Sequence, residues 1–70
     1  MLESIPDAEV LAVLSDASKG ARTVARNRPE IIEDAANDTV LAYIIWRDRI
    51  TNRAAWARTV GRRMARRYLR

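Results

Sequence analysis

The sequence contains no cysteine, no histidine and no phenylalanine, and it has only two glycines and two prolines. Without cysteine or histidine it cannot form disulfides, and it lacks the usual ligands of zinc, haem and iron–sulfur sites. The commonest general base and the strongest nucleophile are therefore also missing. We expect no catalytic residue, no metal site, no cofactor and no enzyme activity.

Long apolar runs are missing too. The longest has seven residues, 40–46, whereas a membrane-spanning helix needs about 20. The residues after Met1 do not follow the basic-then-apolar order of a signal peptide. The sequence therefore predicts a cytoplasmic protein, and its 70 residues suit a single domain covering 1–70.

The charges are distributed unevenly. Residues 1–35 hold seven acids and four bases, a net charge of −3, whereas residues 36–70 hold two acids and nine bases, a net charge of +7. Twelve of the thirteen basic residues are arginine, and no acid follows Asp48. The arginine guanidinium is a planar fork that grips phosphate in two places and stacks on bases. The second half of the chain therefore suits an anionic partner.

The apolar spacing predicts an all-α protein, a small three-helix bundle with helices at about 6–27, 30–47 and 53–69. No stretch alternates apolar and polar residues as a half-buried strand does. The step from Arg28 to Pro29 marks the clearest break, because the residue before proline avoids helical geometry. We expect Thr51 or Asn52 to cap the third helix.

Each predicted helix has its own pattern. In the first, apolar residues recur in steps of three and four across Gly20, which favours one helix continuing to about 27. These residues are Val10, Val13, Leu14, Ala17, Ala21, Val24 and Ala25. The second helix becomes apolar almost all round towards Trp46, which is typical of a central helix. The third has an apolar half and an arginine half, and Gly61 in the apolar half would permit close approach of a neighbouring helix.

The second predicted helix carries acids and no base between residues 30 and 46. Asp34 and Asp38 are four residues apart, a spacing at which like charges cost a helix roughly 0.2–0.5 kcal/mol. The helix dipole favours acids only in the first turn, so it explains Asp38 poorly. Three interpretations stay open: a solvated face, pairing with the arginines of the third helix, or docking on a basic partner.

The arginine half of the third helix is typical of nucleic-acid backbone binding. An acidic protein partner, an anionic membrane surface and a solvated face are the alternatives, although a bundle core would use the apolar half that lipid needs. Trp46 and Trp56 flank the connection between the second and third helices. They either cap the core or, with loop residues, surround an unstacked base. Those loop residues are Arg47, Arg49, Asn52 and Arg53.

The order of these features resembles the second conserved region of bacterial sigma factors of the extracytoplasmic-function type. The segment Glu33-Asp34-Ala-Ala-Asn37-Asp38-Thr-Val-Leu-Ala-Tyr-Ile resembles the family's acidic–Asp–Leu–Val–Gln–Glu–Thr–Phe–Leu–Arg–Ala–Trp helix. The segment from Ala54 to Arg70 is similar to its Ala–Trp–Leu–Tyr–Arg–Ile–Ala–Arg–Asn–Leu–Ala helix. The departures are Asn37-Asp38 in place of the family's glutamine–glutamate pair and a valine in place of its phenylalanine.

The resemblance implies a transcription regulator with two binding surfaces. The acidic helix would dock on the clamp helices of the largest RNA polymerase subunit through Asp34, Asn37 and Asp38. The loop and basic helix would hold promoter DNA through Arg49, Asn52, Arg53, Arg58, Arg62, Arg63 and Arg66. The family's fourth region, a helix-turn-helix, has no room in 70 residues, so the chain could help, redirect or block transcription. The alternatives are a nucleic-acid-binding protein without a polymerase partner and a helical module that binds an acidic protein.

Overall fold

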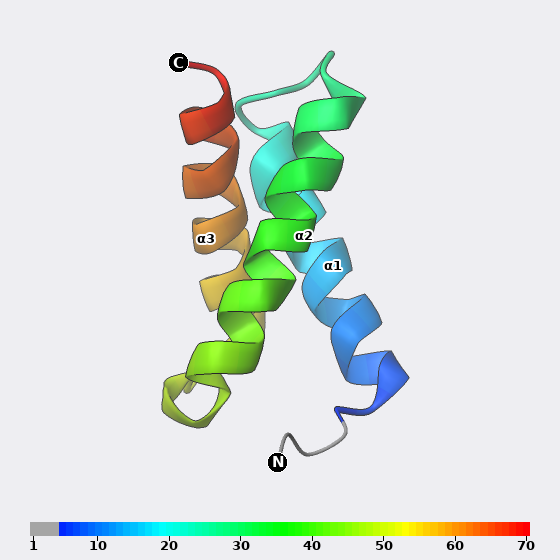
Figure 1. Cartoon of the computed structure of the whole chain (residues 1–70), viewed down its shortest axis with the longest axis vertical. Coiled ribbons are helices and arrows are strands. Elements are labelled where there is room, and N and C mark those ends of the chain that lie inside the picture. The colour runs from blue at the N-terminus through cyan, green and yellow to red at the C-terminus, as the bar shows by residue number, and fades with distance from the viewer. Residues whose placement is uncertain (1–4) are drawn as a thin grey trace.

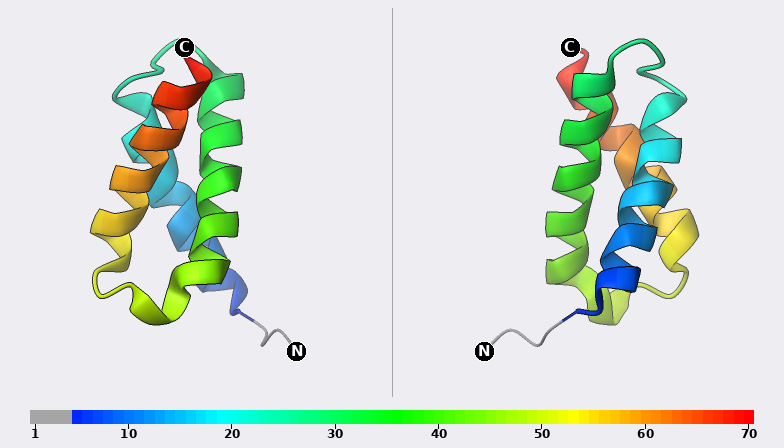
Figure 2. Two further views of the ribbon diagram at one scale, coloured as in Figure 1. Left: turned by 60° about the vertical axis from the view of Figure 1, so that its left-hand side comes forward. Right: turned by 90° about the vertical axis from the view of Figure 1, so that its right-hand side faces the viewer.

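The computed structural model describes residues 5–70 and contains three helices joined by short connections. Helix α1 spans Asp7–Arg22, α2 spans Pro29–Trp46 and α3 spans Arg53–Tyr68. The chain runs up, down and up again along the long axis of the bundle (Figures 1 and 2). A single 3-10 turn, η1 at Arg47–Arg49, lies between α2 and α3. The predicted all-α three-helix bundle is confirmed.

The starts of α2 and α3 follow the local signals in the sequence. Pro29 is the first residue of α2, where its missing N–H costs nothing and its φ angle suits the helix. Asn52 precedes α3, and its side-chain oxygen accepts a hydrogen bond from the backbone N–H of Ala55 at 3.1 Å. Asn52, rather than Thr51, is therefore the cap of the third helix.

The predicted end of the first helix, at about residue 27, is wrong, because α1 ends at Arg22. The carbonyl of Gly20 accepts hydrogen bonds from both the hydroxyl (2.7 Å) and the backbone N–H (3.2 Å) of Thr23. These bonds reach back three residues rather than four, so the chain tightens into a turn. Val24 and Ala25 still pack into the core from that turn, which is why the apolar spacing continued beyond the helix.

The core is built mainly from small residues. Val13 and Thr39 are the largest fully buried side chains, and the Thr39 hydroxyl donates to the carbonyl of Ala35 at 2.7 Å. The buried alanines are Ala17, Ala21, Ala25, Ala35, Ala36, Ala57 and Ala65. Small side chains bury little apolar area each, so the helix axes must approach closely to exclude water.

Glycines allow the closest approach, which is between α1 and α3. A Cβ added to Gly61 would lie 2.3 Å from the carbonyl oxygen of Ala17, and one added to Gly20 would lie 2.0 Å from that of Arg58. Both distances are far inside van der Waals contact. The prediction that Gly61 permits close approach of a neighbouring helix is confirmed, and Gly20 performs the same function on the opposite helix.

The expectation of a central second helix is wrong. In a three-helix bundle each helix has two neighbours, so α2 keeps one face in solvent despite its apolar sequence. Leu41 and Ile45 are 62 % and 73 % exposed, and Ile44 and Trp46 are also exposed. Within residues 5–70, no helix combines the length and the hydropathy needed to cross a bilayer.

Candidate nucleic-acid interface

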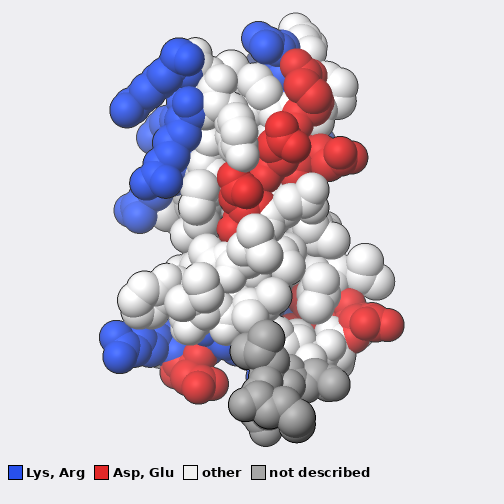
Figure 3. Space-filling view, in the orientation of Figure 1, with Lys and Arg blue, Asp and Glu red and all other residues white. Residues whose placement is uncertain are grey.

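Five arginines of α3 form one surface, which we call the arginine face. It consists of Arg58, Arg62, Arg63, Arg66 and Arg67. All are exposed except Arg62, which is half-buried. They follow helical spacing on the side opposite the buried residues Ala57, Gly61 and Ala65. In Figure 3 the basic side chains on the left form a column along α3. This surface presents planar phosphate-binding groups along about three turns of helix.

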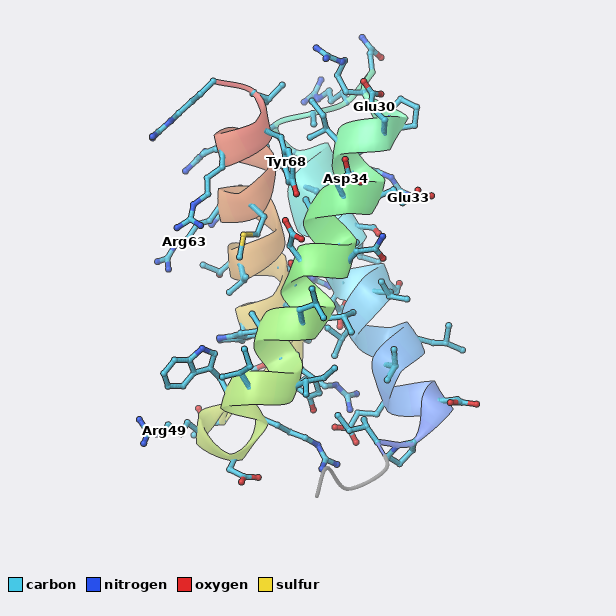
Figure 4. The ribbon with its side chains drawn as sticks, in the orientation of Figure 1. Glu30, Glu33, Asp34, Arg49, Arg63 and Tyr68 are labelled. Carbon is cyan, nitrogen blue, oxygen red and sulfur yellow. The ribbon has the colours of Figure 1, made fainter. Side chains whose placement is uncertain are left out.

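The arginine face is scarcely neutralised by the protein itself. Its one ion pair in the described chain joins Arg58 Nε to Asp16 Oδ1 of α1 at 3.8 Å. None of the acids of α2 lies within ion-pair distance of an α3 arginine in residues 5–70. In the upper half of Figure 3 an uncharged band separates the basic column of α3 from the acids of α2, and in Figure 4 Arg63 points away from α2. Pairing between the two helices, one of the open interpretations, is therefore not observed.

Three acids and one amide of α2 form a second surface, the acidic face, made of Glu33, Asp34, Asn37 and Asp38. The first three are exposed, but Asp38 is half-buried. Its Oδ2 accepts a hydrogen bond from the Tyr68 hydroxyl at 2.5 Å, and this bond, with burial, raises the pKa of Tyr68. The structure thus ties Asp38 to the end of α3 and leaves Asp34 and Asn37 as the freely exposed members of the predicted polymerase-binding set.

Of the four residues predicted around the loop between α2 and α3, Asn52 is exposed along with two of the arginines, and only Arg47 is half-buried. Arg49 and Arg53 are exposed, and the Arg49 guanidinium lies 5.5 Å from the ring centroid of Trp46. Such a cation–π contact holds the guanidinium near the ring face. The side-chain oxygen of Asn52 is committed to capping α3, which leaves its amide NH₂ as the free donor.

The two tryptophans differ in their surroundings. Trp56 is half-buried and packs on Tyr43, with ring centroids 5.9 Å apart and a tilt of 53°. Trp46 is 49 % exposed. Trp56 therefore caps the core as the first interpretation expects, whereas Trp46 keeps half of its surface available.

Sequence reasoning missed a polar cluster that holds this loop. The Arg47 guanidinium donates two hydrogen bonds to the Glu9 carboxylate, from Nε at 2.7 Å and from Nη2 at 3.0 Å. The Tyr43 hydroxyl donates to the same carboxylate. The cluster joins the first turn of α1 to the end of α2, so Arg47 is not free to face a base. The spacing of Tyr43 and Arg47 by four residues was the available signal, but nothing in the sequence indicated that Glu9 would meet them.

The cluster shifts the ionisation of its members. The two hydrogen bonds from Arg47, followed by the one from Tyr43, lower the pKa of Glu9 to about 2 from its ordinary 4.5. Burial, followed by the hydrogen bond to Glu9, raises the pKa of Tyr43. A carboxyl whose pKa is lower in the folded chain stabilises the fold above its unfolded pKa. That stabilisation is lost as the pH falls through the folded value.

Replacing Glu9 should therefore change the acid stability of the protein. We expect Glu9→Gln to lower the melting temperature at pH 7, because Arg47 and Tyr43 lose their charged acceptor. We also expect the difference from the natural chain to shrink between about pH 4.5 and pH 2, where the natural carboxylate takes up its proton. Circular dichroism melts across this range measure the effect. Asp7→Asn, in the same turn and exposed, is the control, and a gap independent of pH would contradict the assignment.

Comparison of the sequence with family models and characterised proteins, and of the fold with solved structures, finds no match. The likeness to sigma factors thus remains a prediction from the residues quoted above.

Proposed function

We propose that this chain is a non-enzymatic transcription regulator of the cytoplasm that binds promoter DNA through the arginine face and RNA polymerase through the acidic face. The observation that carries the proposal is the separation of the two charges. The arginine face has one long ion pair, 3.8 Å to Asp16, and the acids of α2 pair with none of its guanidinium groups in residues 5–70. Charges left unneutralised within the molecule are available to partners of opposite sign.

Nucleic acid is the favoured partner of the arginine face for a chemical reason. A solvated surface usually mixes both signs and uses lysine, whereas this one is single-signed and entirely arginine. Arg49 and Arg53 add two exposed cations near the loop, where the exposed Trp46 offers a stacking surface. The helix and its loop thus combine backbone-binding cations with an aromatic ring.

Polymerase is the proposed partner of the acidic face. The resemblance to the second sigma region implies the clamp helices of the largest subunit as the docking surface. Asp34 and Asn37 are exposed and lie one helical turn apart, as an interface on a helix requires. Because Asp38 bonds to Tyr68, we assign it a supporting part at the edge of this contact.

One set of binding measurements tests both halves of the proposal. We expect Asp34→Arg to abolish capture of purified bacterial core RNA polymerase by the tagged chain, while DNA binding stays equal or becomes stronger. Asp7→Arg, which makes the same charge change on exposed α1, should still capture polymerase. For duplex DNA, neutralising about four to six phosphates should give a slope of log affinity against log salt near −4 to −5.

Each part of the proposal has its own contradicting result. An affinity for duplex DNA that does not change with salt would contradict DNA binding by the arginine face. Polymerase capture that survives Asp34→Arg would remove the acidic face from the polymerase contact. A steep salt slope with no capture of polymerase by the natural chain would leave a nucleic-acid-binding protein without that partner.

A further inference from the structure

A groove of about 420 Å³ lies between α2 and α3. Its floor contains Trp46 from α2 and Trp56, Val60 and Met64 from α3, and Arg63 and Arg67 line it as well. The volume lies in the range of about 300–1,000 Å³ found for small-molecule pockets, which is room for a few apolar side chains. All four floor residues are apolar or aromatic, so they offer few hydrogen bonds to water in the groove.

The apolar surface continues beyond the groove on the α2 side. Seven large apolar residues are exposed in the described chain, and four of them lie within 41–46. Leu41 and Ile45, one turn apart, are 62 % and 73 % exposed. Large apolar residues exposed close together in this way are typical of a protein-binding site.

The lining of the groove is charged on one side only, and the acids of α2 lie outside it. Arg63 and Arg67 stand on the α3 side, and Figure 3 shows the acids of α2 across the uncharged band from the arginine column. Asp34 is exposed on that opposite side. An occupant that fills the groove therefore needs negative charge along the edge that meets Arg63 and Arg67, and an apolar strip beside that edge.

We infer that the α2–α3 groove binds an amphipathic helix of another protein. The apolar side chains of that helix enter the groove and cover Leu41 and Ile45, and its carboxylates face Arg63 and Arg67. The edge of the partner helix that lies along α2 carries no acids, because the exposed acids of α2 would repel them. Helices dock in grooves through side chains spaced by three and four residues, which matches an open apolar channel between two helices. A nucleic-acid backbone is negative along its whole length, so it fits the α3 wall but meets the acids of α2.

The two tryptophans provide a direct readout, because they are the only ones in the chain and both line the groove. The probe is an 18-residue synthetic helix without aromatic residues. It has a leucine strip, glutamates along one edge and lysines along the other. We expect saturable binding with a shift of tryptophan emission to shorter wavelength, as apolar side chains displace water from the rings. The same peptide with lysines on both edges should bind about tenfold more weakly, because it presents no carboxylate to the arginines.

Charge reversal in the chain completes the test. Arg63→Glu with Arg67→Glu should weaken binding of the mixed-edge peptide by about tenfold or more. Arg22→Glu with Arg26→Glu makes the same charge change at exposed positions outside the groove and outside α3, and should change binding by less than about twofold. The inference is overturned by an unchanged tryptophan spectrum or by equal binding of the two peptides. It is overturned as well if the Arg22→Glu, Arg26→Glu control weakens binding as much as the groove variant does. It is also overturned if single-stranded DNA produces the shift and the peptide does not.

Discussion

Gly61→Ala is expected to destabilise the bundle, although alanine is the better helix former. At an open helical position this change would stabilise by about 1 kcal/mol. Here the new methyl would meet the backbone of Ala17, with its Cβ 2.3 Å from the carbonyl oxygen and 2.8 Å from Cα. Backbone atoms cannot turn aside as a flexible side chain can, so α1 and α3 must separate.

The expected cost is about 3 kcal/mol or more, at the upper end of overpacking penalties. A chain of this length has a total stability of roughly 3.5–10 kcal/mol. At about 4–8 °C per kcal/mol for a domain of this size, the melting temperature should fall by roughly 12–24 °C. Gly20→Ala should behave in the same way, because its Cβ would lie 2.0 Å from the carbonyl oxygen of Arg58.

Ser15→Ala is the control for helix propensity, since Ser15 is exposed on α1 and the change also improves the helix. Its melting temperature should stay equal or rise slightly in circular dichroism melts. A melting temperature of Gly61→Ala at or above that of the natural chain would contradict the close packing of α1 on α3.

Features governed by near neighbours in the chain were predictable from sequence. Pro29 at the start of α2 and Asn52 before α3 act on backbone groups within a few residues. The apolar spacing of the first helix correctly identified Val13, Ala17 and Ala21 as core. The same spacing also overran the end of α1, because Val24 and Ala25 pack into the core from a turn, and spacing alone does not distinguish a turn from another helical residue.

Polar contacts between distant segments were not predictable. Glu9 meets Tyr43 and Arg47 from 34 and 38 residues away, and Asp38 meets Tyr68 from 30 residues away. All three contacts depend on the register of the helices, which apolar spacing leaves open. They changed the candidate site in a definite way: Arg47 and Asp38 each acquired a structural partner, whereas Arg63 and Asp34 remained exposed.

The proposed contact between DNA and the arginine face predicts the second large effect, which is a loss of affinity for duplex DNA. Arg62→Gln together with Arg66→Gln removes two positive charges, one helical turn apart on α3, while glutamine keeps part of the aliphatic stem that packs at half-buried Arg62. If each arginine neutralises one phosphate, duplex affinity at 0.1 M salt should fall by about 60-fold. The slope of log affinity against log salt should become shallower by about 1.8. Fluorescence anisotropy of a labelled duplex across a salt series measures both quantities.

Arg22→Gln with Arg26→Gln is the matched control, because it removes the same charge from exposed positions outside α3. It lowers the net charge equally, so any general attraction of a basic protein to DNA falls by the same amount in both double variants. Only direct phosphate contact predicts a larger loss and a shallower slope for the α3 pair. Equal losses from the two double variants would mean that DNA responds to net charge alone, and α3 would then have no special place in the binding surface.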